Sequence, residues 1–567
     1  MYRLVQGSVA MLLLMALLVW GVWLFPFWGM PFNATRHTRV PITPSWALEP
    51  WLWEDDVNTA EEVSRLLQGY RQHDIPVTTI LIDSPWSTRY NDFIVDESRY
   101  PNPEQFFTGL QDKGYRVVLW MTCMVDSYSK DTAIKESQDW FNEAKSNGYL
   151  AGNGFETGWW KGKGGFIDYT NPQAMEWWRG LQKDVLDWGI DGWKLDGTAT
   201  FFSSRIGNLP VPYQKTHKGW MSTRGYMDHY YRDEYQHGLS LNPEFITLAR
   251  SLDGAGHPEG FAPFDAAPVT WVGDQDHAWT LKEEGIEEAL THILDSARLG
   301  YGVIGSDIAG YSGGEIPAEL YIRWAQFSTF CGLFLNGGHG NRALWERSEE
   351  ELTIVRQFTW LHSELVPYIY SHIVAQHEGG PTLMQPQPGK YQYLFGRDLF
   401  VAPIFEPSPT RTVELPAGQW RYFFDDAELI QGPLTVTRDY PWHEFPVFVR
   451  EGAAIPLNVR RKYTGLGDES SEGHITLLLY PGAPSETRVI DPATEKEFVV
   501  KLEKSENITV TLEGEVPPHI LRIHAENAPS SIALDGAQVT EWAFDQAANA
   551  LILKSAAIQG GKYEIVP

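Results

Sequence analysis

The stretch that decides the fold reads Gly189-Ile190-Asp191-Gly192-Trp193-Lys194-Leu195-Asp196-Gly197. Residues 192–196 have the character of a short buried strand that ends on a carboxylate. Before it, residues 172–188 place apolar side chains at helical spacing, and after it Gly197-Thr198-Ala199 is typical of a loop. Helix, strand and polar loop form one unit of an α/β barrel, where chemistry takes place at the carboxyl ends of strands. Asp196 is therefore either a reactive carboxylate or a cap of the next element.

Candidate strands alternate with helical runs from Pro44 to about Tyr370. Most of these strands are apolar and end on Asp, Arg or Asn, which indicates a shared polar pocket at one face of a barrel. Eight such strands predict an α/β fold of the (β/α)8 TIM-barrel type. The eight candidates are residues 77–83, 116–121, 165–168, 192–196, 245–250, 269–274, 303–307 and 332–336.

The pattern of expected secondary structure changes after Tyr370. Short strand-like runs separated by Gly, Pro and Asp predict a β-sandwich, and a polar stretch near residues 464–471 indicates a linker to a second β-rich region. We therefore predict two C-terminal β-sandwich domains. The predicted divisions are an N-terminal segment at 1–43, the barrel at 44–370, a proximal β-sandwich at 371–464 and a distal β-rich domain at 465–567.

The N-terminal segment contains an apolar run without a charge at residues 9–27, long enough to cross a bilayer. A cleaved secretory signal is the alternative, but no convincing small-x-small cleavage site precedes Met30. We therefore expect a hydrophobic membrane anchor, with the globular part exported to a periplasmic, lumenal or extracellular space. If the segment is cleaved, the protein is secreted instead.

Composition narrows the classes of partner. The 567 residues carry 45 Lys and Arg against 73 Asp and Glu, a net charge of -28, which argues against nucleic acid and anionic membrane surfaces as partners. The 24 Trp favour a carbohydrate ligand, because indole rings stack on the apolar faces of sugars, although a large aromatic core needs Trp too. Only Cys123 and Cys331 are present, and we interpret both as buried thiols.

Two strand-end carboxylates, Asp196 and Asp274, lie two barrel units apart and could face each other across the pocket. Glycoside hydrolysis needs such a pair, one as nucleophile or base and the other as general acid, roughly 5–5.5 Å apart when the configuration is retained. Lys194 alternates onto the strand face of Asp196 and could hold it ionised. Further candidates for binding hydroxyl groups are Asp83, Arg250, Asp307 and His339. No His/Asp spacing typical of a metal site is present, and no cofactor is expected.

Several ordered motifs resemble glycoside hydrolase family 31, which contains α-glucosidases and α-xylosidases. The resemblance covers about residues 51–456, and its motifs are specific only in combination. They are FIDYTNPQAMEWW (166–178), DGWKLDG (191–197), LARS (248–251), WVGD (271–274), GSDIAGY (305–311), RWAQ (323–326) with His339, and three segments after the barrel, LVPYIYS, LFVAPIFEPSPTRTVELPAGQW and FPVFVREGAAIP.

The resemblance implies Asp196 as nucleophile, Asp274 as acid/base, and Arg250 and Asp307 as sugar ligands. It implies a retaining exo-acting α-glycoside hydrolase that binds an oligosaccharide or glycoside. The roles of three tryptophans remain open. Trp120 and Trp271 belong either to the pocket wall or to the core, and Trp86 is a candidate for stacking on a sugar.

The sequence departs from the family pattern in places. The barrel begins almost directly after the N-terminal segment, where the family usually carries a large β-sandwich. Pro85 occupies a position where α-glucosidases hold an Asp, and Lys194 before the nucleophile is more like the α-xylosidase branch. The chain also resembles membrane-anchored relatives of the α-galactosidase type. Two alternatives therefore stay open: a catalytically silent, membrane-tethered glycan-binding protein, and an α-transglycosidase that uses the same residues.

Overall fold

The computed structural model describes residues 2–20, 39–207, 209–252, 261–312 and 314–567. Its centre is an eight-stranded parallel sheet with the order β14-β13-β12-β7-β3-β2-β1-β15. A parallel bridge between Asp307 and Leu335 brings the two end strands together, so the sheet closes into a barrel as predicted. The strands are β1 (Trp51–Glu54), β2 (Thr79–Ile82), β3 (Arg116–Met121), β7 (Gly192–Leu195), β12 (Ile246–Arg250), β13 (Val269–Trp271), β14 (Ile304–Gly305) and β15 (Leu335–Gly338).

The unit around Asp196 forms as the sequence predicts. Helix α5 (Pro172–Asp187) begins with Pro172 in its first turn, and the Asn171 side chain caps it by accepting a hydrogen bond from the Gln173 amide. Its buried side chains Ala174, Trp178, Gln182 and Val185 follow helical spacing and cover the barrel. Strand β7 then runs between β3 and β12, and Asp196 follows its last residue.

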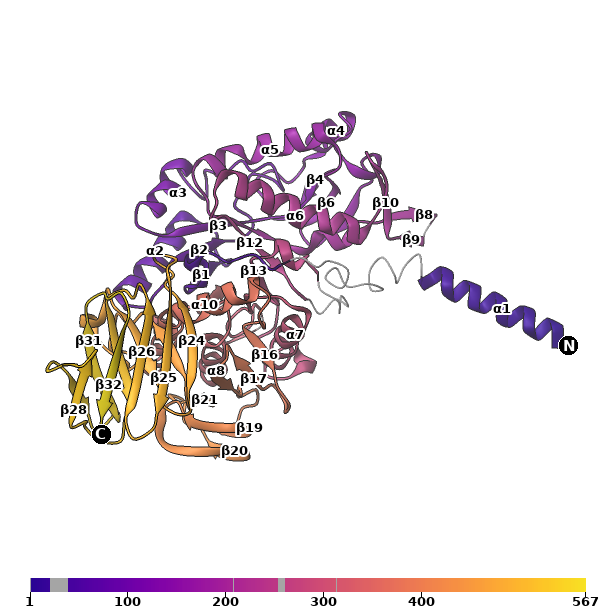
Figure 1. The fold of residues 1–567 in the computed structure, drawn as a ribbon. Coiled ribbons are helices and arrows are strands. Elements are labelled where there is room, and N and C mark those ends of the chain that lie inside the picture. The colour runs from indigo at the N-terminus through magenta and orange to yellow at the C-terminus, as the bar shows by residue number, and fades with distance from the viewer. Residues whose placement is uncertain (1, 21–38, 208, 253–260, 313) are drawn as a thin grey trace.

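One of the eight predicted strands is wrong, and one was missed. Residues 165–168 do not join the barrel: β6 (Gly162–Phe166) pairs antiparallel with β4 (Met124–Ser129) and β5 (Thr157–Trp159) in a small separate sheet. The missing barrel strand is β1, which pairs with β2 and β15. The three-stranded sheet is inserted after β3, so it lies near the barrel end where the pocket was expected (Figure 1).

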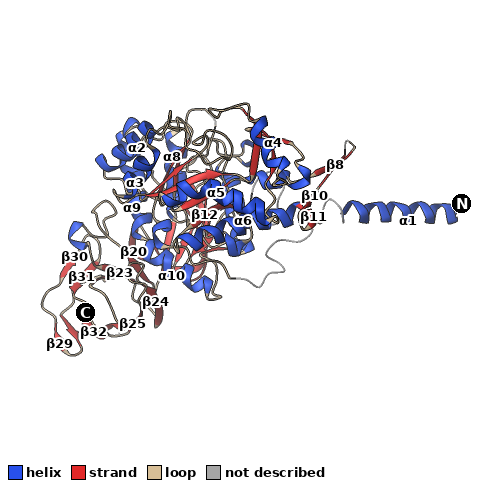
Figure 2. Ribbon diagram, turned by 90° about the horizontal axis from the view of Figure 1, so that it is seen from above, coloured by secondary structure: helices blue, strands red, loops and turns tan. Residues whose placement is uncertain are grey.

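Helices surround the barrel and cover its apolar outer face (Figure 2). Each contributes a stripe of buried side chains to one continuous core that also includes the strands. The helices that follow barrel strands are α2 (Ala60–Gln72), α3 (Pro103–Gln111), α4 (Gln138–Ser146), α5, α6 (Thr223–Leu241), α7 (Ile286–Leu299), α8 (Ala318–Thr329) and α9 (Glu349–Glu364), with α10 (Val366–His377) after them.

The proximal C-terminal region is a single antiparallel sheet rather than the predicted sandwich, with the order β16-β17-β18-β21-β19-β20. One side of it packs on the barrel, where Phe445 stacks on Phe330 just beyond α8 at 6.0 Å. Arg323 of α8 donates hydrogen bonds to the backbone carbonyls of Tyr440 and Glu444. The strands are β16 (Met384–Pro386), β17 (Tyr393–Phe395), β18 (Leu399–Val401), β19 (Thr410–Tyr422), β20 (Asp425–Asp439) and β21 (Val447–Arg450).

The distal region consists of two sheets that enclose their own core, which agrees with a β-sandwich (Figure 1). Strand β22 (Ala454–Leu457) already belongs to it, while the predicted division at 464/465 stays a prediction. One sheet has the order β22-β23-β27-β31-β30 and the other β24-β25-β26-β32-β28-β29. The remaining strands are β23 (Ile475–Leu479), β24 (Ser485–Ile490), β25 (Glu497–Lys504), β26 (Ile508–Gly514), β27 (His519–His524), β28 (Ser531–Leu534), β29 (Ala537–Gln538), β30 (Ala543–Asp545), β31 (Ala550–Ser555) and β32 (Gly561–Val566).

The N-terminal apolar run is described only in part. Helix α1 (Tyr2–Val19) exposes the Leu and Met side chains between Met11 and Leu18, whereas residues 21–27 of the run lie outside the described residues. Within the described part of the chain, no helix combines the length and the apolar character that crossing a bilayer requires. The anchor therefore stays a prediction from the sequence, which fractionation of broken cells would test.

Candidate active site

The carboxyl ends of the barrel strands surround a cavity of about 720 Å³. This volume lies within the range of about 300–1,000 Å³ that is typical of small-molecule sites. Its wall contains aromatic rings, carboxylates, and lysine and arginine side chains. This combination suits a ring that carries hydroxyl groups. The lining residues are Trp53, Asp55, Asp83, Ser84, Trp120, Trp160, Lys161, Lys194, Asp196, Gly197, Thr200, Phe201, Arg250, Gly273, Asp274, Glu284, Glu288 and Tyr311.

Asp196 is held rigidly at the end of β7. Its Oδ1 accepts a hydrogen bond from the Gly197 amide at 2.7 Å, and its Oδ2 accepts one from Trp120 Nε1 at 3.0 Å. Arg250 Nε lies 3.1 Å from Oδ1. Burial by itself raises the pKa of Asp196, but Arg250, Lys194 and these donors outweigh it, so the pKa falls below its ordinary value. Asp196 is therefore ionised at neutral pH.

Asp274 follows β13 and pairs with the same guanidinium, through Arg250 Nη2. The backbone of Asp274 has a φ of 75°, which is uncommon for residues other than Gly and Asn. The Asp274 amide donates a hydrogen bond of 2.8 Å to Asp307 Oδ2, which fixes this turn. The Asp274 side chain is 49% exposed, whereas that of Asp196 is 11% exposed, so the two carboxylates have unlike environments around one shared arginine.

Lys194 forms the floor of the pocket. Its ammonium lies 2.7 Å from Asp83 Oδ2 and 3.9 Å from the centre of the Trp53 ring. Burial lowers the pKa of Lys194, yet the surrounding carboxylates, Asp83 first, outweigh burial and raise it. Asp83 also accepts a hydrogen bond from Trp53 Nε1 at 2.9 Å. Lys194 is thus a buried cation that pairs with Asp83 rather than directly with Asp196.

Three of the predicted binding residues lie behind the wall instead of in it. Asp307 is fully buried, and burial raises its pKa to about 6. Trp271 is also fully buried, and both Arg250 and Lys194 lie over its ring at 4.5 and 5.0 Å. His339 contacts the Tyr311 hydroxyl through Nε2 at 2.9 Å and does not itself line the cavity. These residues support the lining side chains.

The expectation that Trp86 stacks on a sugar is not supported by its position. The side chain is 3% exposed, donates its Nε1 hydrogen to the Trp120 carbonyl at 2.7 Å and packs against Phe93. It is absent from the pocket wall. Trp120, in contrast, lines the pocket and holds Asp196, with Trp159 stacked behind it at 6.2 Å.

The sequence missed several lining residues, above all Asp55, the residue after β1. Burial raises the pKa of Asp55 well above its ordinary value, and the neighbouring Asp83 raises it further. The side chain is 7% exposed and contacts His339 Nε2 at 3.5 Å. Tyr311, which closes the GSDIAGY motif, stacks on Trp53 at 5.3 Å. Recognising residues 51–54 as a barrel strand would have identified Asp55 by its strand-end position.

The rim of the cavity carries two exposed rings, Trp160 and Phe201, which are 42% and 41% exposed. Trp160 lies in the turn between β5 and β6, and Phe201 ends the short helix η4 (Gly197–Phe201) that follows Asp196. Their ring centres are 6.1 Å apart. Among the described residues, no group of three His, Cys, Asp or Glu side chains is arranged to hold a metal ion.

Comparison with known proteins assigns the family. The family description "Glycosyl hydrolases family 31 TIM-barrel domain" matches residues 40–372, and the C-terminal domain of the same family matches residues 376–455. The chain belongs to glycosyl hydrolase family 31. The family predicted from the ordered motifs is therefore confirmed.

Curated members of family 31 align with most of this chain. An α-glucosidase 2 from Bacillus thermoamyloliquefaciens is 25% identical over 88% of this chain, and an α-xylosidase from Emericella nidulans is 25% identical over 82%. The alignments cover 66% and 60% of those two proteins, so this chain spans less than two thirds of their length.

Solved structures agree on the fold. The cycloalternan-forming enzyme from Listeria monocytogenes, in complex with a pentasaccharide substrate, superposes with a TM-score of 0.81 over 93% of this chain and 55% of its own, at 21% identity. A family 31 dextranase from Flavobacterium johnsoniae, complexed with glucose, gives 0.76 over 93% of this chain and 71% of its own, at 21% identity. At this identity the likeness concerns the fold alone.

Proposed function

We propose that this family 31 protein is a retaining, exo-acting α-glycoside hydrolase in which Asp196 is the nucleophile and Asp274 the acid/base. The observation that carries the proposal is the pair of carboxylates at the ends of β7 and β13, both held by Arg250 and both lining one cavity. Two carboxyl groups on either side of a glycosidic bond are what a double displacement requires.

The proposed reaction proceeds in two steps. Asp196, ionised because its pKa is lowered, attacks the anomeric carbon while the Asp274 carboxyl gives its proton to the leaving oxygen, so a glycosyl ester forms and the aglycone departs. Asp274 then takes a proton from water, whose oxygen attacks the anomeric carbon and releases Asp196. Two inversions leave the α configuration of the sugar unchanged. Arg250 reaches both carboxylates and keeps them oriented through both steps.

The substrate we propose is the non-reducing end of an α-linked oligosaccharide. The pocket floor of Asp83, Lys194 and Asp55 offers donors and acceptors for the hydroxyl groups of one terminal ring, which supports exo action. The exposed rings of Trp160 and Phe201 suit the next sugar, because aromatic faces stack on sugar rings. Transglycosylation is a second candidate, supported by this aromatic rim and by the isomaltosyltransferase of Sporosarcina globispora among the relatives, at 23% identity.

The test is a panel of aryl α-xylosides, α-glucosides and α-galactosides with product anomers followed by NMR. We expect turnover of at least one sugar with the α anomer released first. The Asp196→Asn variant should lose several orders of magnitude in kcat while staying folded, because an amide does not form the glycosyl ester. Near-normal turnover by the folded variant would overturn the assignment. A wild-type protein that binds these sugars but turns none over is instead the catalytically silent glycan-binding protein.

A further inference from the structure

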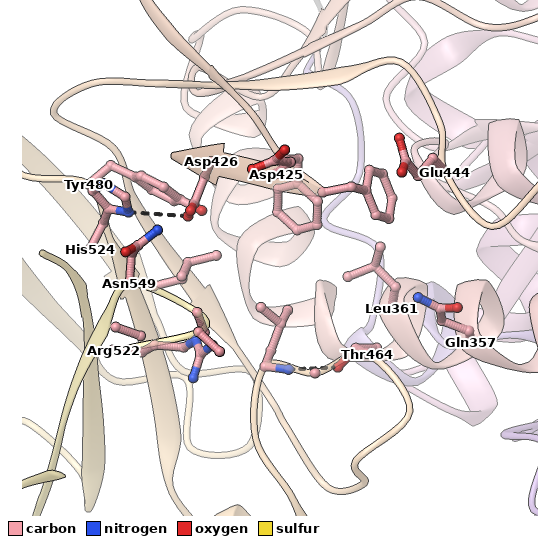
Figure 3. Close-up of a pocket in the computed structure, with 18 of the residues that line it drawn as sticks. Gln357, Leu361, Asp425, Asp426, Glu444, Thr464, Tyr480, Arg522, His524 and Asn549 are labelled. Carbon is pink, nitrogen blue, oxygen red and sulfur yellow. Dashed lines mark hydrogen bonds and ion pairs between the residues drawn. The ribbon is translucent and has the colours of Figure 1, made fainter. Parts of the chain in front are cut away.

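A second cavity, of about 450 Å³, lies where the barrel region, the proximal sheet and the distal sandwich meet (Figure 3). Helix α9 contributes Gln357 and Leu361, and the turn between β19 and β20 contributes Phe423 and Phe424 with two carboxylates beside them. The distal sandwich closes the other side. None of the residues that line this cavity lines the one that holds Asp196.

Arg522 is the unusual member of this wall. It belongs to β27, only 8% of the residue is exposed, and within the described residues its guanidinium makes no hydrogen bond or ion pair. A guanidinium has five N–H donors, and burying them is unfavourable unless they find acceptors. The neighbouring His524 is 7% exposed, and in the described part of the chain neither of its ring nitrogens has a hydrogen-bond partner. Within the described residues, the Arg522 guanidinium, whose nitrogens are accessible from the cavity, and the buried His524 ring thus face the cavity without hydrogen-bond partners.

The opposite wall supplies acceptors and ring faces. Asp426 Oδ2 lies 3.3 Å from His524 Nδ1, too poorly aligned for a hydrogen bond, and Asp425 is exposed beside it. Tyr480 stacks on His524 with ring centres 5.6 Å apart. Asn549, in the turn between β30 and β31, adds an amide that both donates and accepts (Figure 3). The cavity therefore offers donors, acceptors and aromatic surface together.

The charged side chains of the cavity favour a neutral ligand over an anionic one. Three carboxylates, those of Asp425, Asp426 and Glu444, line the cavity together with the single guanidinium of Arg522, so a phosphate or another strong anion would meet repulsion. A neutral sugar meets none, because each hydroxyl group both donates to a carboxylate and accepts from an N–H, and its apolar ring face packs on Phe or Tyr.

We propose that this cavity is a second, non-catalytic saccharide-binding site that holds a neutral glycan between the three parts of the chain. It goes beyond the proposed function, since binding here involves no residue of the catalytic pocket and needs no turnover. Occupancy would also join α9, the β19–β20 turn and β27 through one ligand, so the bound glycan adds to the stability of the interface.

The experiment measures binding in the full chain carrying Asp196→Asn, which prevents turnover. Maltotriose and isomaltotriose are titrated by calorimetry into this protein and into the same protein carrying Arg522→Met as well, which removes the guanidinium and leaves a shorter, unbranched apolar side chain. We expect two classes of site in the parent and at least a tenfold weaker second class in the Arg522→Met protein. Asn549→Gly is the second variant: Asn549 has φ of 45°, so Gly removes the amide without straining the turn.

Arg488→Met is the matched control, because Arg488 is in the same sandwich but pairs with Glu378 and Glu497 away from this cavity. It should leave both classes of site unchanged, and Arg522→Met in the otherwise wild-type chain should leave turnover of aryl glycosides unchanged. A single class of site that no Arg522 or Asn549 variant affects would overturn the proposal. Binding of inorganic phosphate, but of neither saccharide, through Arg522 would overturn it as well.

Discussion

Arg250 holds two carboxylates at once, and this shared contact governs how the proposed acid/base works. Nε pairs with Asp196 and Nη2 with Asp274, while Trp271 lies under the guanidinium. Asp196 has three further stabilising influences, from Lys194, the Gly197 amide and Trp120, whereas the Asp274 side chain is half exposed. Asp196 is therefore the carboxylate that stays ionised and serves as nucleophile, which leaves Asp274 for the acid/base role.

The Asp274→Ala variant tests that role. Its activity on substrates with poor leaving groups should fall by roughly a hundredfold or more, because proton donation contributes about 10²–10⁴ in rate. A glycosyl fluoride needs little protonation, so its first step should largely survive. Azide needs no general base, so it should restore turnover and yield a glycosyl azide of α configuration. Equal losses on both substrates, without rescue by azide, would assign the acid/base elsewhere.

The positions of single residues were predicted well where a sequence motif determines them. They were predicted poorly where side-chain packing determines them. Asp196, Asp274 and Arg250 lie together as their strand-end positions required. Trp86 was misjudged because nothing in its neighbours says which way a Trp side chain points; its ring turned inward against Phe93. Asp55 was missed because its strand has only four residues, Trp51–Glu54, all of them buried, so no alternation of polar and apolar side chains marks it.

At the scale of elements, the barrel strands were predictable and the inserted sheet was not. Residues 165–168 are mostly apolar and end on Asp like a barrel strand, but β6 belongs to a hairpin whose pairing with β4 depends on contacts distant in the sequence. That misplaced element has a role at the pocket: its turn brings Trp160 to the rim, opposite Phe201. The insertion therefore shapes the side of the pocket where the aglycone is expected.

Removing the Trp160 ring should weaken binding of the sugar that follows the cleaved bond. Stacking contributes about 1 kcal/mol, so Trp160→Ala should lower kcat/KM for oligosaccharides by roughly five- to tenfold. A glycosyl fluoride, which has no second sugar, should be unaffected. The matched control is Trp220→Ala, because Trp220 is 73% exposed on β11 (Gly219–Ser222) and does not line the pocket. Equal losses on the fluoride and the oligosaccharide would show that Trp160 acts on the chemical step instead.

At the scale of the whole molecule, the pKa values of two glutamates at opposite ends of α9, Glu351 and Glu364, are shifted in opposite directions. Glu351 caps the N-terminus with Ser348 and pairs with Arg347; burial raises its pKa, but these contacts outweigh burial and lower it. Glu364 ends the helix beneath the linker and is fully buried. Its Oε2 accepts a hydrogen bond from the Thr464 hydroxyl at 2.7 Å, and no other described residue bonds its Oε1. Burial raises the pKa of Glu364 to about 8.

The raised pKa makes Glu364 a source of instability as pH rises. Between the ordinary pKa of 4.5 and the raised pKa of about 8, the unfolded chain releases the proton of Glu364 while the folded chain retains it, so stability falls across this window. Glu364→Gln should remove that loss, raising the free energy of unfolding at pH 8 by up to about 4 kcal/mol and changing it little at pH 4.5. Urea unfolding at both pH values measures this difference. Glu351→Gln, on the same helix, should destabilise the protein at pH 8 instead; stabilisation by both variants would contradict the assignment.

Strand β22 has a consequence for whether the C-terminal parts are separable modules. Its backbone pairs with β23 of the distal sandwich, while Ile455 and Leu457 are buried in the core shared with the barrel. A chain that stops at Thr464 keeps β22 with its hydrogen-bonding edge open, and exposed edges promote aggregation. A chain that stops at Glu451 instead loses Ile455, Leu457 and every later side chain that belongs to the shared core. Both truncations should aggregate in light scattering below the melting temperature of the full chain, whereas equal stability of either would mean that the sandwich is dispensable. Because β22 belongs both to the distal sheet and to the core shared with the barrel, we expect that the distal sandwich cannot be removed without destabilising the rest of the chain.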